Sequence, residues 1–437
     1  MFIFIGIYLA LVLLRPQDYP VWAEQMAGIP LLPISLAMAA MFWALSPQKS
    51  FDAPQYLLLP VFMVFAMLTK IANGWVGGIV LIVAYFGPVV MAFFLMANAL
   101  DSRRRLVAMM AVFTVCAGIM SLHGIEQVQL GVGWTGIGLS QETRIQYVGI
   151  FNDPNDLGMV FIMCLPMAML LAGRGGLFGL RRLFWLTVAG VLVYGVYLTD
   201  SRGTLLALVV MLGVYAWRRY GMMAAGGLGA VALVGLMALP SRLQELEVSE
   251  DSAAGRVDAW YEGLQMFFAD PVFGIGAGGY SDLDQLTAHN SFVLVLTETG
   301  FIGFMLWLAF IGYGVRMLLA VLNAPSDIVL TGWIPDDMPD GEVAELQQAW
   351  TFDRKLGLTL FLSVCGFFAC AFFLSRGYVV ILYLQAAMIV AYYTLMRRRY
   401  PGLPEFKLGN DLLRWPIYAV IGVVLLFIIV KVLLAFA

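Results

Sequence analysis

The chain has 437 residues, of which 62% are hydrophobic and only 12% are charged, and its formal net charge is −3. A soluble core of this length cannot bury so much apolar surface, so the composition excludes an ordinary soluble protein. The slightly acidic balance also argues against nucleic acid as a partner, because nucleic-acid binding requires a basic surface.

Apolar blocks of about 15 to 25 residues follow one another along the chain, and each is long enough, or nearly so, to cross about 30 Å of hydrocarbon. We predict an all-α polytopic membrane protein with 12 or 13 transmembrane helices. The first block is a full span or a half-span; without a cationic start or a cleavage site, it is read as retained. The predicted spans lie near 2–14, 29–45, 55–72, 77–98, 105–122, 156–173, 183–199, 203–217, 222–239, 290–316, 356–374, 377–396 and 415–436.

The basic residues predict which side faces the cytoplasm. When the spans are threaded alternately from a cytoplasmic N-terminus, one side holds about 17 Lys and Arg against about seven on the other, as the positive-inside rule requires. Two loops, 123–155 and 240–289, then lie on the outer face. A third loop, 317–355, is cytoplasmic and acidic, with a short surface helix expected in its second half, and we assign it no chemistry. The basic segments are "SRRR" (102–105), "GRGGLFGLRR" (173–182), "RR" (218–219), "RK" (354–355) and "RRRY" (397–400).

No metal site is predicted. The four cysteines lie in apolar segments without ligand spacing and are read as packing residues. The outer carboxylates and histidine also form no recognisable ligand pattern.

His289 is one of only two histidines, and it directly precedes a long apolar run in "HNSFVLVLTETGFIGF". It follows the largest outer loop, and Asn290 or Ser291 is expected to be the N-cap of the next helix. A histidine that caps or anchors a helix is one reading. Because imidazole titrates near neutral pH, a general base is the other. His123 begins an outer loop and has no arginine close in sequence.

Two arginines on the outer side are candidates for binding phosphate. Arg202 lies between two closely spaced spans, where snorkelling to the interface is the alternative reading. Arg256 is expected to open an amphipathic helix in which Trp260, Leu264 and Phe267 recur at helical spacing, with a solvated loop arginine as the alternative. Arginines at headgroup depth beside a histidine suit a phosphorylated lipid, because guanidinium binds phosphate bidentately.

Other polar residues on the outer face are candidates for contact with substrate. The glycine-rich "DPVFGIGAGGYSD" allows close backbone approach, as in a phosphate or sugar cradle, or else forms a tight re-entry turn. The acidic residues of "FNDPNDLGM" fall at a helix start, where capping competes with sugar binding. "LSRGY" (374–378) echoes "DSRGT" (200–204). The candidates are Asp153, Asp156, Tyr280, Asn290 and Arg376.

Three motifs in fixed order, "TDSRGTLLAL", "GRVDAWYEGLQMFFADPVFGIGAGGY" and "HNSFVLVLTETGFIGFMLWL", together resemble the O-antigen ligase and polymerase superfamily of bacterial inner membranes. The resemblance covers roughly 150–315. It implies a GT-C-like fold with a periplasmic loop subdomain and a metal-independent glycosyltransferase without a cofactor. By this resemblance His289 is the catalytic histidine, and Arg202 and Arg256 bind the donor's diphosphate.

The family also implies the substrates. Its members move a glycan from undecaprenyl diphosphate to a hydroxyl on lipid A core, on a second lipid-linked glycan or on a protein, at the periplasmic face. Ligase and polymerase both fit the motifs, and the outer loop, at about 50 residues, is short for the family. The predicted regions are N-terminal transmembrane helices (1–149), a ligase-like catalytic region with the periplasmic loop 240–289 (150–316), the cytoplasmic loop (317–355) and C-terminal transmembrane helices (356–437).

A multi-pass transporter of an anion or a lipid-linked sugar is the alternative. The glycine-broken spans at 74–80 and 224–232 are compatible with discontinuous transporter helices, although small residues also permit close helix packing. A transporter should place ionisable residues near the midplane, whereas here nearly all lie at span ends. This placement and the motif order favour the enzyme.

Overall fold

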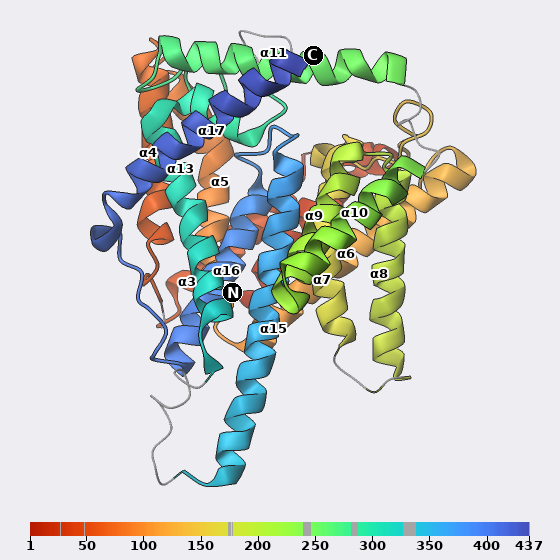
Figure 1. Cartoon of the computed structure of the whole chain (residues 1–437), viewed down its shortest axis with the longest axis vertical. Helices are drawn as coiled ribbons and strands as arrows, with labels where there is room; N and C mark the ends of the chain where they lie inside the picture. The colour runs from red at the N-terminus through yellow and green to blue at the C-terminus, as the bar shows by residue number, and fades with distance from the viewer. Residues whose placement is uncertain are drawn as a thin grey trace.

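The computed structural model describes residues 1–436 apart from 27, 48, 174, 175, 177, 239–245, 281–286 and 327–337. In these residues the chain forms helices and two isolated β-bridges, so it is an all-α polytopic membrane protein (Figure 1). The helices are α1 (Phe2–Leu14), α2 (Ala23–Met26), α3 (Leu31–Ala44), α4 (Gln55–Ala72), α5 (Gly78–Ala99), α6 (Arg103–Leu130), α7 (Pro154–Ala172), α8 (Leu180–Leu198), α9 (Arg202–Tyr220), α10 (Met222–Ala238), α11 (Leu246–Ala269), α13 (Ser291–Asn323), α15 (Asp340–Ala371), α16 (Val380–Arg399) and α17 (Arg414–Phe436).

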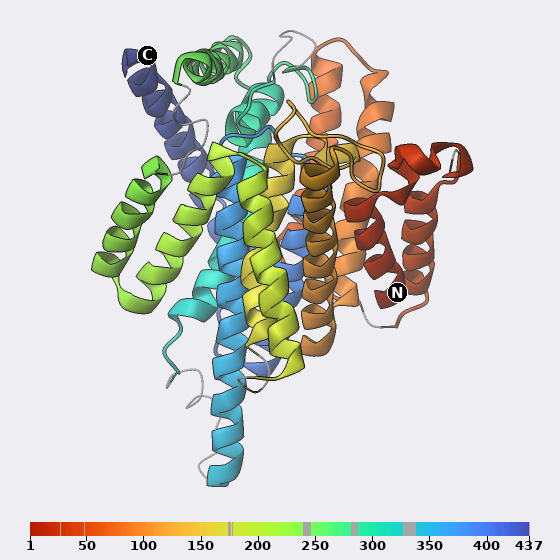
Figure 2. The ribbon, with the colours of Figure 1, turned by 90° about the vertical axis from the view of Figure 1, so that its right-hand side faces the viewer.

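Ten helical segments of the described chain are long and apolar enough to cross a membrane. The predicted 12 or 13 spans also included α1, α9 and α10. α1 has 13 residues, about 20 Å at 1.5 Å per residue, which is shorter than the hydrocarbon core. α9 and α10 form a hairpin. Its turn stops short of the end of the bundle that α7 and α8 reach (Figure 2).

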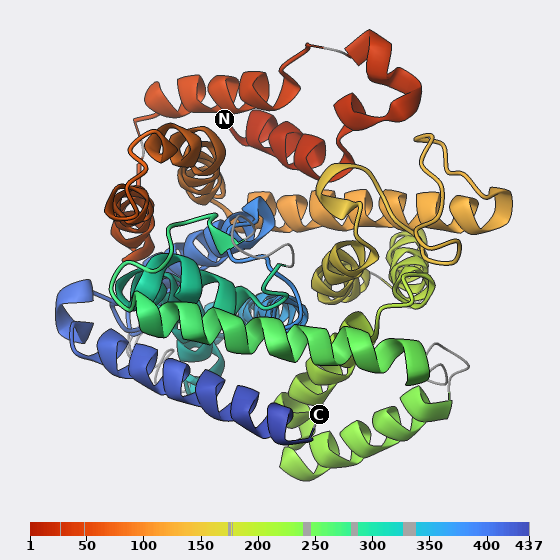
Figure 3. The same cartoon turned by 90° about the horizontal axis from the view of Figure 1, so that it is seen from above.

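The spans form a bundle around α7, which packs against α6, α8, α9 and α15. α1 and α3 stand together at one side of this bundle (Figure 3). At one end, α11 lies across the bundle with α17 beside it, and we call this end the upper face (Figures 1 and 3). At the opposite end, the lower face, α15 extends beyond its neighbours (Figure 1).

α11 confirms the predicted amphipathic helix but not its start. Trp260, Leu264 and Phe267 are all buried, and the helix packs against α13 and α17. It begins at Leu246, so Arg256 lies inside the helix instead of opening it. The residues before Arg256 are acidic and polar, so a hydropathy pattern does not indicate a helix there, although their backbone is helical.

Three predicted loop boundaries are wrong for the same reason. α6 continues to Leu130, which places His123 inside a helix, and α13 continues to Asn323. The expected short surface helix is the first part of the 32-residue α15, which starts at Asp340. Helices that project beyond the bilayer keep their backbone hydrogen bonds, so the end of an apolar run does not mark the end of the helix. Residues 239–245 and 281–286 of the predicted outer loop, and 327–337 of the acidic loop, lie outside the described residues.

The glycine-rich segment after α11 docks onto a break in α13. The break is at Gly300, whose φ of 61° and ψ of −168° are not helical. The amide of Ile275 donates to the carbonyl of Thr297 at 3.0 Å, and the amide of Phe301 donates to the carbonyl of Pro271 at 2.8 Å. The two segments therefore share backbone hydrogen bonds inside the protein.

Two glycines make this backbone contact possible. A Cβ on Gly274 would lie 2.3 Å from the carbonyl oxygen of Thr297, and a Cβ on Gly300 would lie 2.4 Å from that of Val272. Both glycines also have positive φ. Of the two readings offered for the glycine-rich segment, these contacts favour the tight re-entry turn.

Candidate active site

Five segments meet at the upper face, and each supplies one residue that the sequence singled out. Asp153 is the N-cap of α7, and Arg202 is the first residue of α9. Arg256 lies in α11, His289 directly precedes the N-cap of α13, and Arg376 lies in the loop between α15 and α16. These residues influence one another electrostatically, so the fold gathers them into one site.

His289 is held in a constrained position at the start of α13. Its φ of 46° lies in the left-handed region, which costs a non-glycine residue roughly 1–3 kcal/mol. Asn290, the next residue, caps the helix by accepting hydrogen bonds from the amides of Phe292 at 2.9 Å and Val293 at 3.1 Å. The predicted cap is confirmed, and it fixes the half-buried imidazole at the end of the helix.

The surroundings of His289 favour the neutral imidazole. Burial lowers the pKa of His289, and the positive charge of Arg256 lowers it further. Asp153 acts in the opposite direction, and Arg376 again lowers the pKa. The N-terminus of α13 adds a positive potential. A neutral imidazole can accept a proton, which is what a general base requires.

Arg202 and Arg256 form a cationic pair. Burial lowers the pKa of the half-buried Arg256, Asp153 raises it, and the charge of Arg202 lowers it, so the two guanidinium groups repel each other. Ser201 caps α9 by accepting from the amide of Thr204, which places Arg202 in the first turn of that helix. Two arginines within electrostatic reach of each other, one of them in the first turn of a helix, are suited to an anion with several oxygens.

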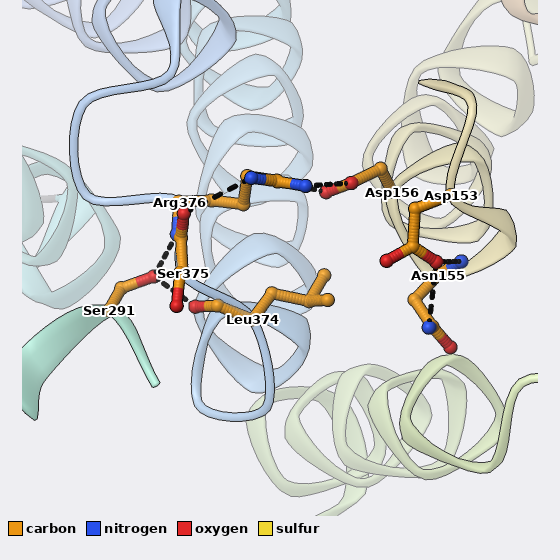
Figure 4. Close-up of polar contacts among 7 residues, drawn as sticks. All are labelled: Asp153, Asn155, Asp156, Ser291, Leu374, Ser375 and Arg376. Atoms are coloured by element: carbon orange, nitrogen blue, oxygen red, sulfur yellow. Dashed lines mark hydrogen bonds and ion pairs between the residues drawn. The ribbon is translucent and has the colours of Figure 1, made fainter. Parts of the chain in front are cut away.

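Arg376 makes a bidentate ion pair with Asp156 at the start of α7 (Figure 4). Asp156 is only 1% exposed. The amide of Arg376 donates to the Ser291 hydroxyl at 2.8 Å, and that hydroxyl donates to the carbonyl of Leu374 at 2.6 Å. The loop between α15 and α16 is thereby tied to α7 and α13, and the Asp156 carboxylate is already occupied by a protein partner.

Asn155 links the starts of α7 and α9, and the sequence reading missed it. Its side chain and amide both donate to Asp153 Oδ1 at 2.8 Å. Its own Oδ1 accepts from Ser201 Oγ at 2.6 Å and from Arg144 at 3.0 Å. Asn155 therefore connects the cap of α7 to the residue before Arg202. The only signal for it in the sequence is its place between two aspartates.

Tyr280 and Asn290 are buried, with 1% and 0% exposure. The Tyr280 hydroxyl donates to the carbonyl of Ala259 at 2.5 Å, one turn beyond Arg256 in α11. The Tyr280 amide donates to Glu298 Oε1 at 3.3 Å. Glu298 is itself buried in α13 and attracts the charge of Lys70. These contacts hold α11 against α13. The sequence feature that marks Glu298 is an acidic residue inside an apolar run.

The structure does not bring His123 into this site. Its ring is fully buried, and Nε2 lies 2.8 Å from Thr135 Oγ1. The rings of Trp134 and Tyr147 make edge contacts with it, each at 4.9 Å between centroids. His123 therefore contributes to the packing of the segment that follows α6.

The fold and site together define a multi-pass membrane protein with a histidine of lowered pKa and a pair of arginines at one end of its bundle. Residues 186–308 match the family model described as O-Antigen ligase, a segment that contains Arg202, Arg256 and His289. This match supports the O-antigen ligase superfamily and, in general, a membrane glycosyltransferase of that type. The family implies lipid-linked glycan substrates in a bilayer. No curated protein matches the chain.

Proposed function

We propose that this protein transfers a glycan from undecaprenyl diphosphate to an acceptor hydroxyl at the periplasmic face of the bacterial inner membrane, as an O-antigen ligase or a polysaccharide polymerase. The observation that carries the proposal is the position of His289. Burial and the charge of Arg256 lower the pKa of its imidazole, and Arg256 lies within electrostatic reach of Arg202.

Arg202 and Arg256 bind the diphosphate of the donor. As the bond between the anomeric carbon and the phosphate oxygen breaks, its electron pair moves to that oxygen and negative charge grows on the diphosphate. Fixed guanidinium groups stabilise this charge more in the transition state than in the ground state. The polyprenyl chain stays in the bilayer, which accounts for an active site at the end of a membrane bundle.

His289 is the general base. A sugar hydroxyl is a weak nucleophile, so its attack on the anomeric carbon requires removal of its proton. The imidazole takes that proton as the new glycosidic bond forms, and undecaprenyl diphosphate leaves. This scheme needs no metal and no cofactor.

The distribution of arginines supports a periplasmic site. Arg103 to Arg105 begin α6 and Arg397 to Arg399 end α16, both at the lower face. By the positive-inside rule the lower face is cytoplasmic, the N-terminus lies inside and the upper face lies in the periplasm.

The experiment is glycan transfer from a defined undecaprenyl-diphosphate donor by the purified protein in liposomes. We expect His289→Gln to lower kcat by about 10²- to 10⁴-fold, the usual contribution of a positioned base. Donor affinity should stay near the wild-type value, because the arginines are intact. His123→Gln, provided that it folds, is the matched control and should retain its transfer rate. If His289→Gln kept more than a tenth of the wild-type rate, the base would lie elsewhere.

A further inference from the structure

We propose that the cavity between the start of α7 and the loop joining α15 to α16 binds a sugar ring of the acceptor, with an uncharged or amino sugar as the ligand class. This assignment rests on the proposed transferase function and adds an acceptor subsite to it. The cavity has a volume of about 480 Å³. It is lined by Gly149, Ile150, Asn152, Asp153, Ser375, Arg376, Tyr378 and Val379.

The charge of the cavity disfavours phosphate. The guanidinium of Arg376 is already neutralised by the buried carboxylate of Asp156, with which it makes two hydrogen bonds (Figure 4). Asp153 adds a second carboxylate to the wall, so the carboxylates of Asp153 and Asp156 stand against the single guanidinium of Arg376 there. A diphosphate would be repelled here, whereas Arg202 and Arg256 would attract it. The site therefore has a subsite for an anion and a subsite for a ligand without negative charge.

The wall offers hydrogen-bonding groups that lack protein partners. Ser375 Oγ is buried without a hydrogen bond among the described residues. An unpaired buried polar group costs about 1–3 kcal/mol, which a ligand hydroxyl would offset. Asp153 Oδ1 accepts from Asn155, while no described group donates to Oδ2. Asn152 is exposed and presents a primary amide. Acceptors and donors at several points match the hydroxyl groups of a sugar.

The apolar lining suits the rest of a sugar ring. Ile150 comes from the segment before α7 and Val379 from the loop before α16, and Tyr378 adds an aromatic ring. Pockets for small molecules combine such apolar surface with a few polar groups that orient the ligand. A pyranose has the same division, with hydroxyl groups at its edge and C–H groups on its faces.

The cavity is placed correctly for transfer. Asp153 and Arg376, which line it, both act on the charge of His289, and so does Arg256 of the cationic pair. His289 is therefore within electrostatic reach of residues from both subsites. In the proposed reaction it takes the proton of an acceptor hydroxyl that points from the cavity toward the donor's anomeric carbon.

The test uses the full-length protein in lipid nanodiscs with two kinds of probe. Methyl glycosides of glucose, galactose, N-acetylglucosamine and glucosamine are titrated by saturation-transfer NMR, and inorganic pyrophosphate is titrated by calorimetry. The variants are Asn152→Leu and Ser375→Ala for the cavity and Arg202→Ala for the cationic pair. Asn410→Leu, at an exposed asparagine between α16 and α17, is the matched control.

We expect at least one methyl glycoside to bind, and both cavity variants to weaken it by about five- to tenfold, as for loss of one neutral hydrogen bond. Pyrophosphate affinity should be unchanged in these variants and reduced in Arg202→Ala. The assignment is overturned if no glycoside binds, if the cavity variants bind as wild type does, or if pyrophosphate displaces the glycoside and Asn152→Leu loses pyrophosphate. If only Arg202→Ala behaves unexpectedly, by retaining pyrophosphate, the proposed donor site fails and the acceptor subsite stands.

Discussion

At the residue scale, the reactivity of His289 is set by opposing charges from separate helices. Burial and Arg256 lower its pKa, and Asp153 raises it. A base must be deprotonated at the working pH, so each neighbour shifts the pH range in which the enzyme is active. His289 has a strained backbone, and the next residue, Asn290, caps α13 by accepting from the amide of Phe292. The cap holds the imidazole where these charges act.

Asp153→Asn gives a direct test of this balance. Asn is as good an N-cap as Asp, so α7 should keep its start. Without the carboxylate, the imidazolium loses a stabilising charge and the pKa of His289 falls. The acid limb of the kcat profile should therefore move to lower pH, measured as glycan transfer from about pH 4 to 9. Asp258→Asn, an exposed site in α11, is the control and should leave the limb in place. A limb that moved to higher pH would contradict the charge argument.

At the element scale, the broken helix α13 positions the site. Its first half carries His289 at one end and accepts the glycine-rich segment at Gly300, while Thr297 Oγ1 donates to the carbonyl of Gly263 in α11 at 2.9 Å. The break lets the segment between Arg256 and His289 fold back into the bundle. α11 and α13 are thereby joined by hydrogen bonds on both sides of the connection.

Gly300→Ala should destabilise the protein. Its backbone conformation is one that essentially only glycine adopts, and strain there costs roughly 1–3 kcal/mol before the overlap of Cβ with the Val272 carbonyl is added. We expect a lower Tm and a larger relative loss of transfer, because His289 and Arg256 would shift apart. Gly229→Ala in α10, where no atom lies within 4 Å of the new Cβ, should be neutral or slightly stabilising. Equal Tm values for Gly300→Ala and wild type would refute the role of the break.

The sequence predicted what depends on local pattern and missed what depends on distant contacts. The bundle, the buried face of α11 and the cap before α13 follow from apolar periodicity and from the residue types at a helix start. The pairing of Asp156 with Arg376 joins residues 220 positions apart, and no local signal indicates it. Likewise Glu298 could be recognised as an unusual buried acid, but its contact with the Tyr280 amide depends on the break at Gly300. The ends of α6 and α13 and the start of α15 were misplaced because polar residues continue a helix beyond the membrane.

At the scale of the whole molecule, the two ends of the bundle differ in chemistry. The lower face carries runs of arginine at the ends of α6 and α16, and some of them are tied to the buried Asp353 of α15 by ion pairs from Arg103 and Arg399. Among the described residues, the arginines near His289 at the upper face, Arg202, Arg256 and Arg376, stand singly in the chain and not in runs. This division predicts the orientation of the protein in the membrane, and in the proposed reaction it attracts the donor's diphosphate to the face where His289 lies.

The orientation can be measured with single cysteines in intact cells and a membrane-impermeant thiol reagent. Glu262 is exposed on α11 at the upper face, and Glu345 is exposed near the start of α15 at the lower face. We expect Glu262→Cys to be labelled without permeabilising the inner membrane and Glu345→Cys to be labelled only after lysis. The unsubstituted protein is the control, because three of its four cysteines are buried and the fourth is half-buried inside a span. Labelling of Glu345→Cys alone in intact cells would invert the topology, and the neutral histidine and its arginines would then face the cytoplasm, where the proposed periplasmic transfer could not take place.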